Sequence, residues 1–393
     1  NAQEPQKLDL KQALEMGLKN NQSILASELD TKMQTQLQKT AFDIPKTEIT
    51  GVFGQINSQA QDKNFGISQS FNPFQISAKR NLLKENSNMS NTKLLVSKQE
   101  ISYSIKQAWN ALLYYEKQNT VLEKQNVIMQ KFVKSANLKF QTGETNTLEK
   151  TIALAKQQEL EQKIKQNKTK IAIEKSKLKV VLDLKNDFFV SDTTFVAFPV
   201  VNNIDTTMVK QNPIVQLANQ QVQVAQANHK VEKSALFPDI SLGYFIQSIT
   251  GYQDVNGTPT YYNNSPQFQG FSVGLAVPLF AGSNIAKAKA AKTNMEREQK
   301  NADYVTQQFK SYLEQQLEQL ETYQSLVQYY KVTALPNANL IIKNATKSYQ
   351  NGDISYVEYV QSIETASEIQ LNYNDAIYNF NQTVITIQYS INQ

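Results

Sequence analysis

One stretch limits the possible fold more than any other: residues 76–139 keep the periodicity of a helix and contain neither Gly nor Pro. These two residue types most often end or kink a helix, so the sequence predicts one unbroken helix here. At 1.5 Å per residue, such a helix is roughly 95 Å long. It cannot fit inside a compact globule, and we therefore expect an elongated, mainly α-helical protein.

The long helix is predicted to end in a tight turn, and the same turn recurs later in the chain. Residues 140–149 (FQTGETNTLE) and 349–358 (YQNGDISYVE) share an aromatic residue, a glycine, an acid, an apolar residue and a second acid, each 209 residues apart. Glycine supplies the left-handed backbone conformation that commonly closes a helix. We therefore expect tip turns at Gly143 and Gly352, each joining two helices, and an internal duplication.

Around residues 47–73 and 239–279, the period of the sequence changes from that of a helix to that of a strand. Each segment holds two runs in which large apolar residues alternate with small or polar ones, and a polar loop joins the two runs. This is the pattern of a β-hairpin. Four strands are predicted, with large apolar side chains on one face and Gly, Ser, Ala or Gln on the other.

These elements divide the chain into two structural repeats. Residues 1–200 are interpreted as a helix (8–42), the first hairpin, the long helix, the tip turn 140–149, a second helix and an irregular segment (186–207). Residues 201–393 repeat the order: helix, hairpin, long helix (285–347), tip turn 349–358 and a final helix. Two further matches support the duplication, both at an offset of 208 residues: Gly66 with Gly274, and Ala78-Lys79 with Ala286-Lys287.

The predicted helices carry narrow apolar stripes. After the first tip turn, apolar residues recur at steps of four and seven, which is the seam of a coiled coil; they are Leu160, Ile164, Ile171, Leu178 and Leu182. Such stripes are used up when the helices pack on one another, so they leave little to cover the apolar face of the hairpins. The hairpins could close with copies of themselves into a lipid-facing barrel. The alternative is a sheet half-buried under the helices.

Composition excludes several classes of function. The chain has no cysteine, which rules out disulfides, zinc–thiolate sites and thiol nucleophiles, and its single histidine, His229, rules out a His-His metal motif within one chain. Neither a catalytic constellation nor a phosphate-binding glycine loop is recognisable, so we expect no enzyme, no metal site and no cofactor. The net charge of +5 is modest and spread along the helices, which argues against nucleic-acid binding.

With these elements in this order, the sequence resembles a known family, the TolC-like outer membrane efflux proteins of Gram-negative bacteria. The resemblance rests on Asn212-Pro213 at the start of the second repeat, on residues 237–243 (FPDISLG) entering a strand and on residues 274–282 (GLAVPLFAG) leaving one. The two glycine turns, at Gly143 and Gly352, complete it. None of these motifs is highly specific alone, but their order in a tandem repeat covers essentially the whole chain.

The resemblance implies a homotrimer that contacts outer membrane lipid. Each chain would give four strands to one twelve-stranded transmembrane β-barrel, and the coiled-coil helices would form an α-barrel across the periplasm, with residues 186–207 in an equatorial belt. The implied function is a passive conduit for small molecules or metal ions, joined by a periplasmic adaptor (membrane fusion protein) to an inner-membrane transporter of the RND type. Asn1-Ala-Gln-Glu is interpreted as the end left by removal of a signal peptide, which favours export.

The resemblance also implies a gate at the periplasmic tip. Glu149 and Glu358 match the family's acidic positions after the tip glycines, and Tyr349 matches a tyrosine that helps to hold the closed state. Two positions depart from the family: Gln361 stands where a second acid often occurs, and Ile354 where a basic residue can occur. Three copies of a carboxylate around a narrow pore would attract cations. The alternative is that both acids only complement the N-terminal ends of their helices.

The exported substrate is less defined. Residues 69–73 (QSFNP) resemble the heavy-metal branch of the family, although the scattered methionines and His229 are better explained by packing. Two rival functions stay open: a structural or adhesive periplasmic or surface coiled-coil protein, and the outer membrane conduit of a type I protein secretion system. The sequence does not decide between a drug, a metal and a protein as substrate, name the inner-membrane partner, or say whether the tip is closed at rest.

Overall fold

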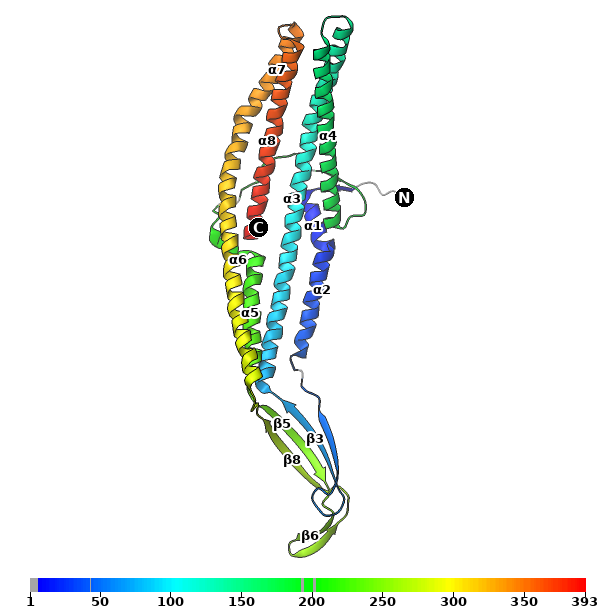
Figure 1. Cartoon of the computed structure of the whole chain (residues 1–393), viewed down its shortest axis with the longest axis vertical. Coiled ribbons are helices and arrows are strands. Elements are labelled where there is room, and N and C mark those ends of the chain that lie inside the picture. Colours follow the sequence, from blue (N-terminus) through cyan, green and yellow to red (C-terminus); the bar gives the residue numbers. More distant parts are fainter. Residues whose placement is uncertain (1–5, 43, 192–193, 201–202) are drawn as a thin grey trace. The chain divides into compact units, whose positions relative to one another are not determined.

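In the computed structural model of the chain, long helices and a small antiparallel sheet separate into two units (Figure 1). The helical unit comprises Asn1–Glu28, Lys93–Gln216 and Val305–Gln393, and the sheet unit comprises Leu29–Thr92 and Leu217–Tyr304. The structure describes residues 6–42, 44–191, 194–200 and 203–393. The segment Asn1 to Glu4, on which the prediction of processing depends, lies outside the described residues.

The helical unit is built on two helical hairpins (Figure 1). Its elements are β1 (Gln6–Leu8), α1 (Leu10–Asn20), the second part of α3 (Pro73–Gln141), α4 (Thr147–Leu182), β4 (Phe188–Val190), η2 (Thr206–Gln211), the end of α6 (Gly282–Tyr329), the π-helix η3 (Tyr330–Ala334), α7 (Leu335–Asn351) and α8 (Tyr356–Ile391). The first hairpin is α3 with α4, and the second is α7 with α8. Both predicted tip turns therefore exist.

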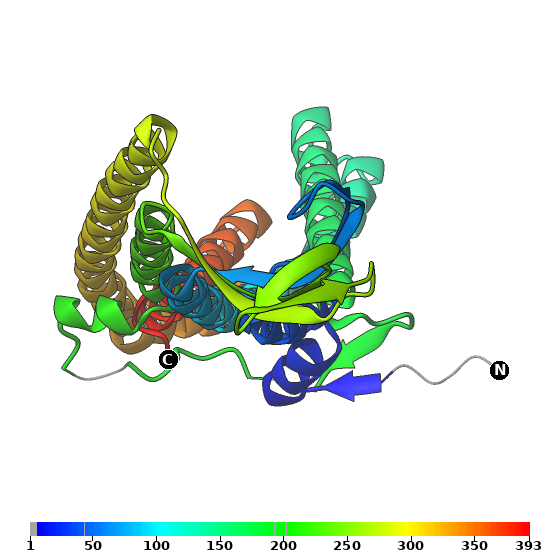
Figure 2. The same cartoon turned by 90° about the horizontal axis from the view of Figure 1, so that it is seen from below.

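Narrow apolar seams hold the helical unit together. Leu160, Ile164, Leu178 and Leu182 of the predicted coiled-coil seam are buried, and Ile171 packs against the core. One buried cluster surrounds Trp109; its largest members are Leu8, Ile105, Leu112, Leu178, Leu182, Phe188 and Ile377. Strand β1 pairs in parallel with β4 over this cluster, and Figure 2 shows their two short arrows beside each other. This small sheet is absent from the sequence prediction.

The sheet unit contains the two predicted β-hairpins. Its elements are most of α2 (Gln22–Leu37), η1 (Gln38–Phe42), β2 (Glu48–Gly54), β3 (Asp62–Phe71), the start of α3, most of α5 (Pro213–Ser234), β5 (Asp239–Gln247), β6 (Gly251–Val255), β7 (Thr258–Tyr262), β8 (Phe268–Ala276) and the start of α6. The strands form one antiparallel sheet in the order β2-β3-β5-β8 (Figure 1). The segment between β5 and β8, predicted as a loop, holds the extra hairpin β6–β7.

The register of the sheet places most of the large apolar side chains on one face and mostly small or polar side chains on the other. Ile67 lies opposite Tyr244, and Tyr244 lies opposite Phe271, so apolar side chains form rows on one face. On the other face Gly270 lies opposite Phe245, and a Cβ atom on this glycine would come within 2.6 Å of the Phe245 ring. Real Cβ contacts are essentially never that short, so a larger residue at position 270 would force the Phe245 ring to move.

The helix predicted over residues 8–42 is in fact two helices, α1 and α2, that meet at Asn21. The Asn21 side chain accepts a hydrogen bond from Ser23 N (2.9 Å) and donates one to Val181 O (2.9 Å), which anchors the break to the last turn of α4. Asn212 makes the same connections in the second half: it accepts from Ile214 N (2.8 Å) and donates to Ser390 O (3.3 Å) in the last turn of α8.

No helix in the described part of the chain is long and apolar enough to cross a membrane.

Candidate functional site

The two tip turns have the same backbone geometry. Gly143 and Gly352 adopt positive φ angles of 78° and 81°. Their hydrogen bonds correspond one to one: Gly143 N to Phe140 O (3.2 Å) and Glu144 N to Lys139 O (2.8 Å) in the first turn, Gly352 N to Tyr349 O (3.1 Å) and Asp353 N to Ser348 O (2.8 Å) in the second. This is the Schellman pattern that closes a helix with a left-handed residue. The match supports the predicted duplication.

The second helix of each hairpin begins with a side-chain cap. In α4 the Asn146 side chain accepts a hydrogen bond from Glu149 N (3.0 Å), and in α8 the Ser355 hydroxyl accepts one from Glu358 N (3.3 Å). The Glu358 carboxylate returns the contact by accepting from Ser355 N at 2.7 Å, which completes a capping box. The Glu149 carboxylate instead accepts from the Thr145 hydroxyl. Only Glu358 is therefore tied to the backbone of its own helix start.

The capping box also affects the charge of Glu358. Hydrogen bonds from the backbone and the hydroxyl of Ser355 stabilise its ionised form, so the pKa of Glu358 lies below its usual value. Its carboxylate stays negative at neutral pH while being held at the N-terminal end of α8, where a negative charge also interacts favourably with the helix dipole. This geometry is compatible with either the gate or the purely local role considered above.

An aromatic group joins the second hairpin to the first. The Tyr349 ring stacks on Tyr359 (centroids 4.9 Å apart) and contacts the edge of Tyr356 (5.1 Å), and Tyr356 stacks on Phe132 of α3 (4.1 Å). Tyr356 is buried, which raises the pKa of its hydroxyl, and its Oη has no hydrogen-bond partner among the described residues. These rings belong to an apolar group, the tip cluster, whose other buried members are Leu122, Met129, Ala136, Ala153, Leu160, Ile164 and Val360.

A groove of about 370 Å³ lies between the two hairpins. Glu149 and Gln361 both line it, together with Phe132, Asn146, Leu148, Ile152, Lys156, Val357 and Val360. Lys156 forms an ion pair with Glu364, which links α4 to α8. Glu149 thus lines the same groove as Gln361, the residue at which the sequence departs from the pattern of the family. Of the other predicted gate residues, Glu358 forms part of the capping box of α8, and Tyr349 packs in the tip cluster.

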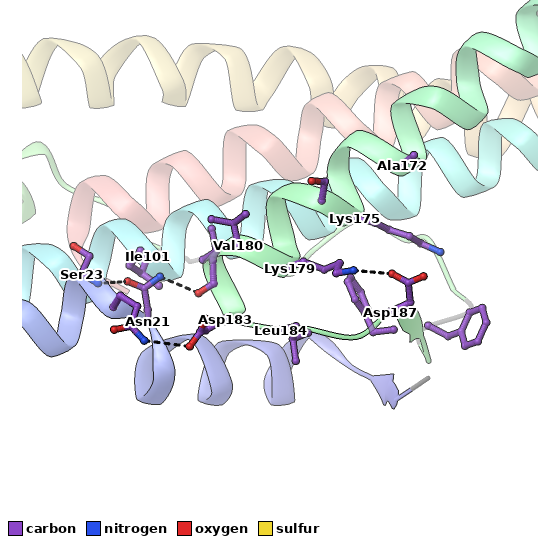
Figure 3. A pocket seen from close by; sticks show the side chains of 15 residues that line it. Asn21, Ser23, Ile101, Ala172, Lys175, Lys179, Val180, Asp183, Leu184 and Asp187 are labelled. Atoms are coloured by element: carbon purple, nitrogen blue, oxygen red, sulfur yellow. Dashed lines mark hydrogen bonds and ion pairs between the residues drawn. The ribbon is translucent and has the colours of Figure 1, made fainter. Parts of the chain in front are cut away.

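A second, more open hollow of about 1100 Å³ lies where α1 meets α2, beside the last turns of α4 (Figure 3). Figure 3 shows Lys179 pointing toward Asp187, and their charged atoms are 2.8 Å apart. This pairing holds the pKa of Asp187 below its usual value. Lys175 in the same hollow is paired with Glu116 at 3.7 Å. Part of the predicted equatorial segment 186–207 lines the hollow, while residues 192–193 and 201–202 lie outside the described part.

The apolar face of the sheet is exposed. Phe271 and Val273 are 85% and 78% exposed, and Ile49 at the other side of the sheet is 79% exposed. The same face carries Phe53, Phe65, Ile67, Leu242, Tyr244 and Leu275. An exposed apolar surface of this extent marks a site that is covered by a partner or by lipid. The sheet is therefore the second functional feature of the chain.

Comparisons with known proteins bear on the fold of the chain. The family model described as outer membrane efflux protein matches residues 207–393. Among solved structures the chain is similar to CusC (TM-score 0.78, 16% identity, 100% of this chain and 94% of that chain), which is described as forming a transmembrane channel. It is also similar to the CmeC outer membrane channel of Campylobacter jejuni (0.78, 13%, 97% and 85%). A third similar structure is the open state of the MtrE outer membrane channel of Neisseria gonorrhoeae (0.70, 12%, 97% and 88%). No curated protein sequence matched the chain.

The fold therefore defines the class: the whole chain has the TolC-like fold that solved outer membrane channels share, mainly α with a small β part. The model of the outer membrane efflux protein family matches the second half of this fold, residues 207–393. The resemblance and fold class predicted from the sequence are confirmed, whereas the heavy-metal branch stays a prediction.

Proposed function

We propose that the chain is a subunit of an outer membrane channel-tunnel, a passive conduit of a tripartite efflux system in a Gram-negative bacterium. The observation that carries this proposal is the sheet, with an exposed apolar face and a second face of small residues. This is the alternation required of a strand that has lipid on one side and a water-filled lumen on the other. The family match of residues 207–393 supports the same function.

The edges of the sheet favour assembly with copies of the chain. Strands β2 and β8 are the outer strands of the sheet in the described residues, so each presents one row of unpaired backbone groups. Pairing β2 of one copy with β8 of the next would satisfy these groups. Three copies would close a twelve-stranded transmembrane β-barrel, with the helices extending into the periplasm as an α-barrel.

The tip is proposed as the periplasmic gate and as the end that meets a periplasmic adaptor and, through it, an inner-membrane transporter of the RND type. Leu148 and Val357, beside the groove between the hairpins, are 66% and 49% exposed and offer apolar contact to a partner. In a trimer, Glu149 and Glu358 would each occur three times around the pore, with Tyr349 bracing the second hairpin. Such rings would favour cations.

The substrate is a separate question. The motif of residues 69–73 has a structural role, because Asn72 accepts a hydrogen bond from Gln75 N (3.0 Å) at the start of α3 and donates to Phe237 O (3.2 Å) and Asp239 Oδ1 (3.0 Å). Asn72 thus links the end of β3 and the start of α3 to the start of β5, which explains why Asn follows Phe71 here. Export of metal ions through this conduit rests on the sequence resemblance alone.

The proposal is tested by membrane insertion of two matched variants on one strand. Val273→Lys places a charge on the apolar face, where it costs about 2–4 kcal/mol at the middle of a bilayer. Ser272→Lys places the same charge on the face of small residues, where it would be lumenal. We expect the first variant to lose outer membrane trimers and the second to retain them and conduct. Recovery of the unmodified chain as a monomer in water without detergent would refute the channel.

The gate is tested by single-channel conductance. Glu149→Gln and Glu358→Gln should each lower the preference for cations and weaken block by multivalent cations, because each removes three charges per pore. Glu161→Gln, on the exposed surface of α4, is the control and should change neither. If both tip variants behave like this control, the acids are not at the constriction.

A further inference from the structure

The face of the sheet that carries mostly small or polar residues also holds two phenylalanine rings. Phe245 of β5 lies opposite Gly66 on β3 and opposite Gly270 on β8. Phe268 of β8 lies on the same face, two residues before Gly270 and opposite Gln247. The two phenylalanines are diagonal neighbours on adjacent strands, about 7–8 Å apart, a separation that aromatic side chains can bridge. They therefore form a pair on this face.

The ring of Phe245 lies along the sheet instead of standing upright on it. Its Cζ and Cε1 atoms would be 2.6 and 2.9 Å from a Cβ atom on Gly270, so the ring reaches over the backbone of the adjacent strand. In the same row, Thr50 Oγ1 would be 2.8 Å from a Cβ atom on Gly66. Glycine thus gives each larger side chain space to lie against the sheet. The Phe245 ring is only half-buried there, so a molecule above this face can contact it.

The aromatic pair continues into the extra hairpin β6–β7. The ring of Tyr262 in β7 meets the ring of Phe268 edge to face, with the two centroids 5.0 Å apart. All three rings are partly exposed. We call the side chains of Phe245, Phe268 and Tyr262 the aromatic track. It runs from the hairpin along the start of β8 and into the sheet.

The charged side chains on this face are acidic. Within the four strands of the main sheet, all of which the structure describes, Glu48, Asp62 and Asp239 lie on it, and no lysine or arginine does. Asp62 is 1% exposed, because its carboxylate accepts hydrogen bonds from backbone N–H groups of two loops. Glu48 and Asp239 are exposed. Carboxylates and the faces of aromatic rings both attract cations, so this face favours a cation over an anion.

We infer that the aromatic track is a binding site inside the barrel, and that its ligand is an organic cation that carries an aromatic ring. This inference rests on the proposed function, because the face becomes the wall of a lumen only when the sheet closes. An aromatic ring of the ligand stacks on Phe245 or Phe268, and its charge is attracted by the rings and by the acids of the same face. An aliphatic cation of the same charge lacks the stacking and is held less.

Protection of an introduced cysteine tests the site in membrane-inserted trimers. The chain has no cysteine, so Ser272→Cys, which is exposed on the same face two residues beyond Gly270, places a single thiol beside Phe245. Ser70→Cys is the matched control on this face, four residues from Gly66 and therefore roughly 13 Å further along the sheet. Each thiol is labelled by a charged, membrane-impermeant reagent in the presence of tetraphenylphosphonium or of the aliphatic tetrabutylammonium.

We expect tetraphenylphosphonium to slow the labelling of Ser272→Cys but not of Ser70→Cys, and tetrabutylammonium to slow neither. Adding Phe245→Leu should raise the concentration of tetraphenylphosphonium that gives half-maximal protection about three- to tenfold, because the leucine offers no ring. Phe245→Tyr keeps the ring and should keep the protection. If Phe245→Leu fails to assemble, Phe268→Leu removes the other ring of the pair, with the same expectation.

Three results would overturn the aromatic track: no protection by tetraphenylphosphonium, equal protection by the two cations, or protection that persists unchanged in the leucine variant. The labelling without any cation separates these results from a failure of the proposed function. If the face does not line a water-filled lumen, the impermeant reagent reaches neither thiol, and both proposals fail. If both thiols react and the rings make no difference, only the aromatic track is wrong.

Discussion

The two tip hairpins share a backbone and differ in their side chains. Both close on a left-handed glycine, both start their second helix on a polar cap, and both second helices have 36 residues. At matching positions, however, Tyr349 stacks on Tyr359 in the second hairpin, whereas the Lys150 ammonium lies 4.7 Å over the Phe140 ring in the first. The two hairpins therefore share the residues that the turn needs and differ in the contacts that hold each hairpin in place.

The largest expected difference is at the position after the cap. Tyr356→Ala should destabilise the start of α8 by about 3 kcal/mol or more, because it removes a buried ring stacked on Phe132. The matching change in the first hairpin, Thr147→Ala, alters an exposed side chain and should cost less than about 0.5 kcal/mol. Hydrogen exchange of the first turns of α8 and α4 measures both. Similar losses in the two hairpins would contradict the comparison.

The caps should show a smaller difference of the same sign. Ser355→Ala breaks both bonds of the capping box, and Asn146→Ala breaks one, so we expect losses of about 1–2 and about 1 kcal/mol. Amide exchange at Glu358 and Glu149 reports each cap directly. Replacing each cap residue by that of the other hairpin, Ser355→Asn and Asn146→Ser, should restore most of the amide protection that the alanine variants lose. A larger loss in the first hairpin would mean that the capping box adds nothing.

The glycines should show no difference. Gly143→Ala and Gly352→Ala each force a side chain into a positive φ, and a Cβ at either position meets no atom within 4 Å. Only backbone strain is added, which costs about 1 kcal/mol in both cases. Thermal unfolding of the two variants should therefore shift equally. A clear inequality would show that one turn touches a part of the assembly that the other does not.

Local signals account for what the sequence could predict. Glycine at a helix end and a change of period from helix to strand depend on neighbouring residues only, so both tip turns and all four strands of the main sheet were predictable. The hairpin β6–β7 was missed although Asn256-Gly257, with positive φ angles of 57° and 85°, is a strong signal of a tight hairpin turn. The capping box was also readable, since Ser355 and Glu358 have the required spacing.

The other features that the sequence did not predict depend on contacts between segments that are far apart in the chain. The parallel pair β1 and β4 joins residues about 180 positions apart through two three-residue strands, too short to show a period. The groove that brings Glu149 to Gln361 requires the packing of two hairpins, which spacing alone does not define. The π-helix η3 has no distinctive amino-acid composition. Its two sequence signals are Pro336 inside a helical pattern and the change of the repeat offset from 208 to 209 residues. Both can be interpreted only when the buried residues of the two long helices are known.

The smallest expected effect concerns the charge of Glu358. Its pKa in the folded chain lies below the ordinary value of 4.5 because Ser355 donates to the ionised carboxylate. A lowered pKa in the folded state means that the stabilisation is complete above pH 4.5 and is lost as the pH falls through the folded pKa below it. Protection of the first turn of α8 should therefore weaken in that acid range. Glu358→Gln keeps an acceptor for the capping box but cannot titrate, so its protection should be independent of pH there. If the variant kept the pH dependence, another group would be responsible, and the capping box would no longer distinguish the second hairpin from the first.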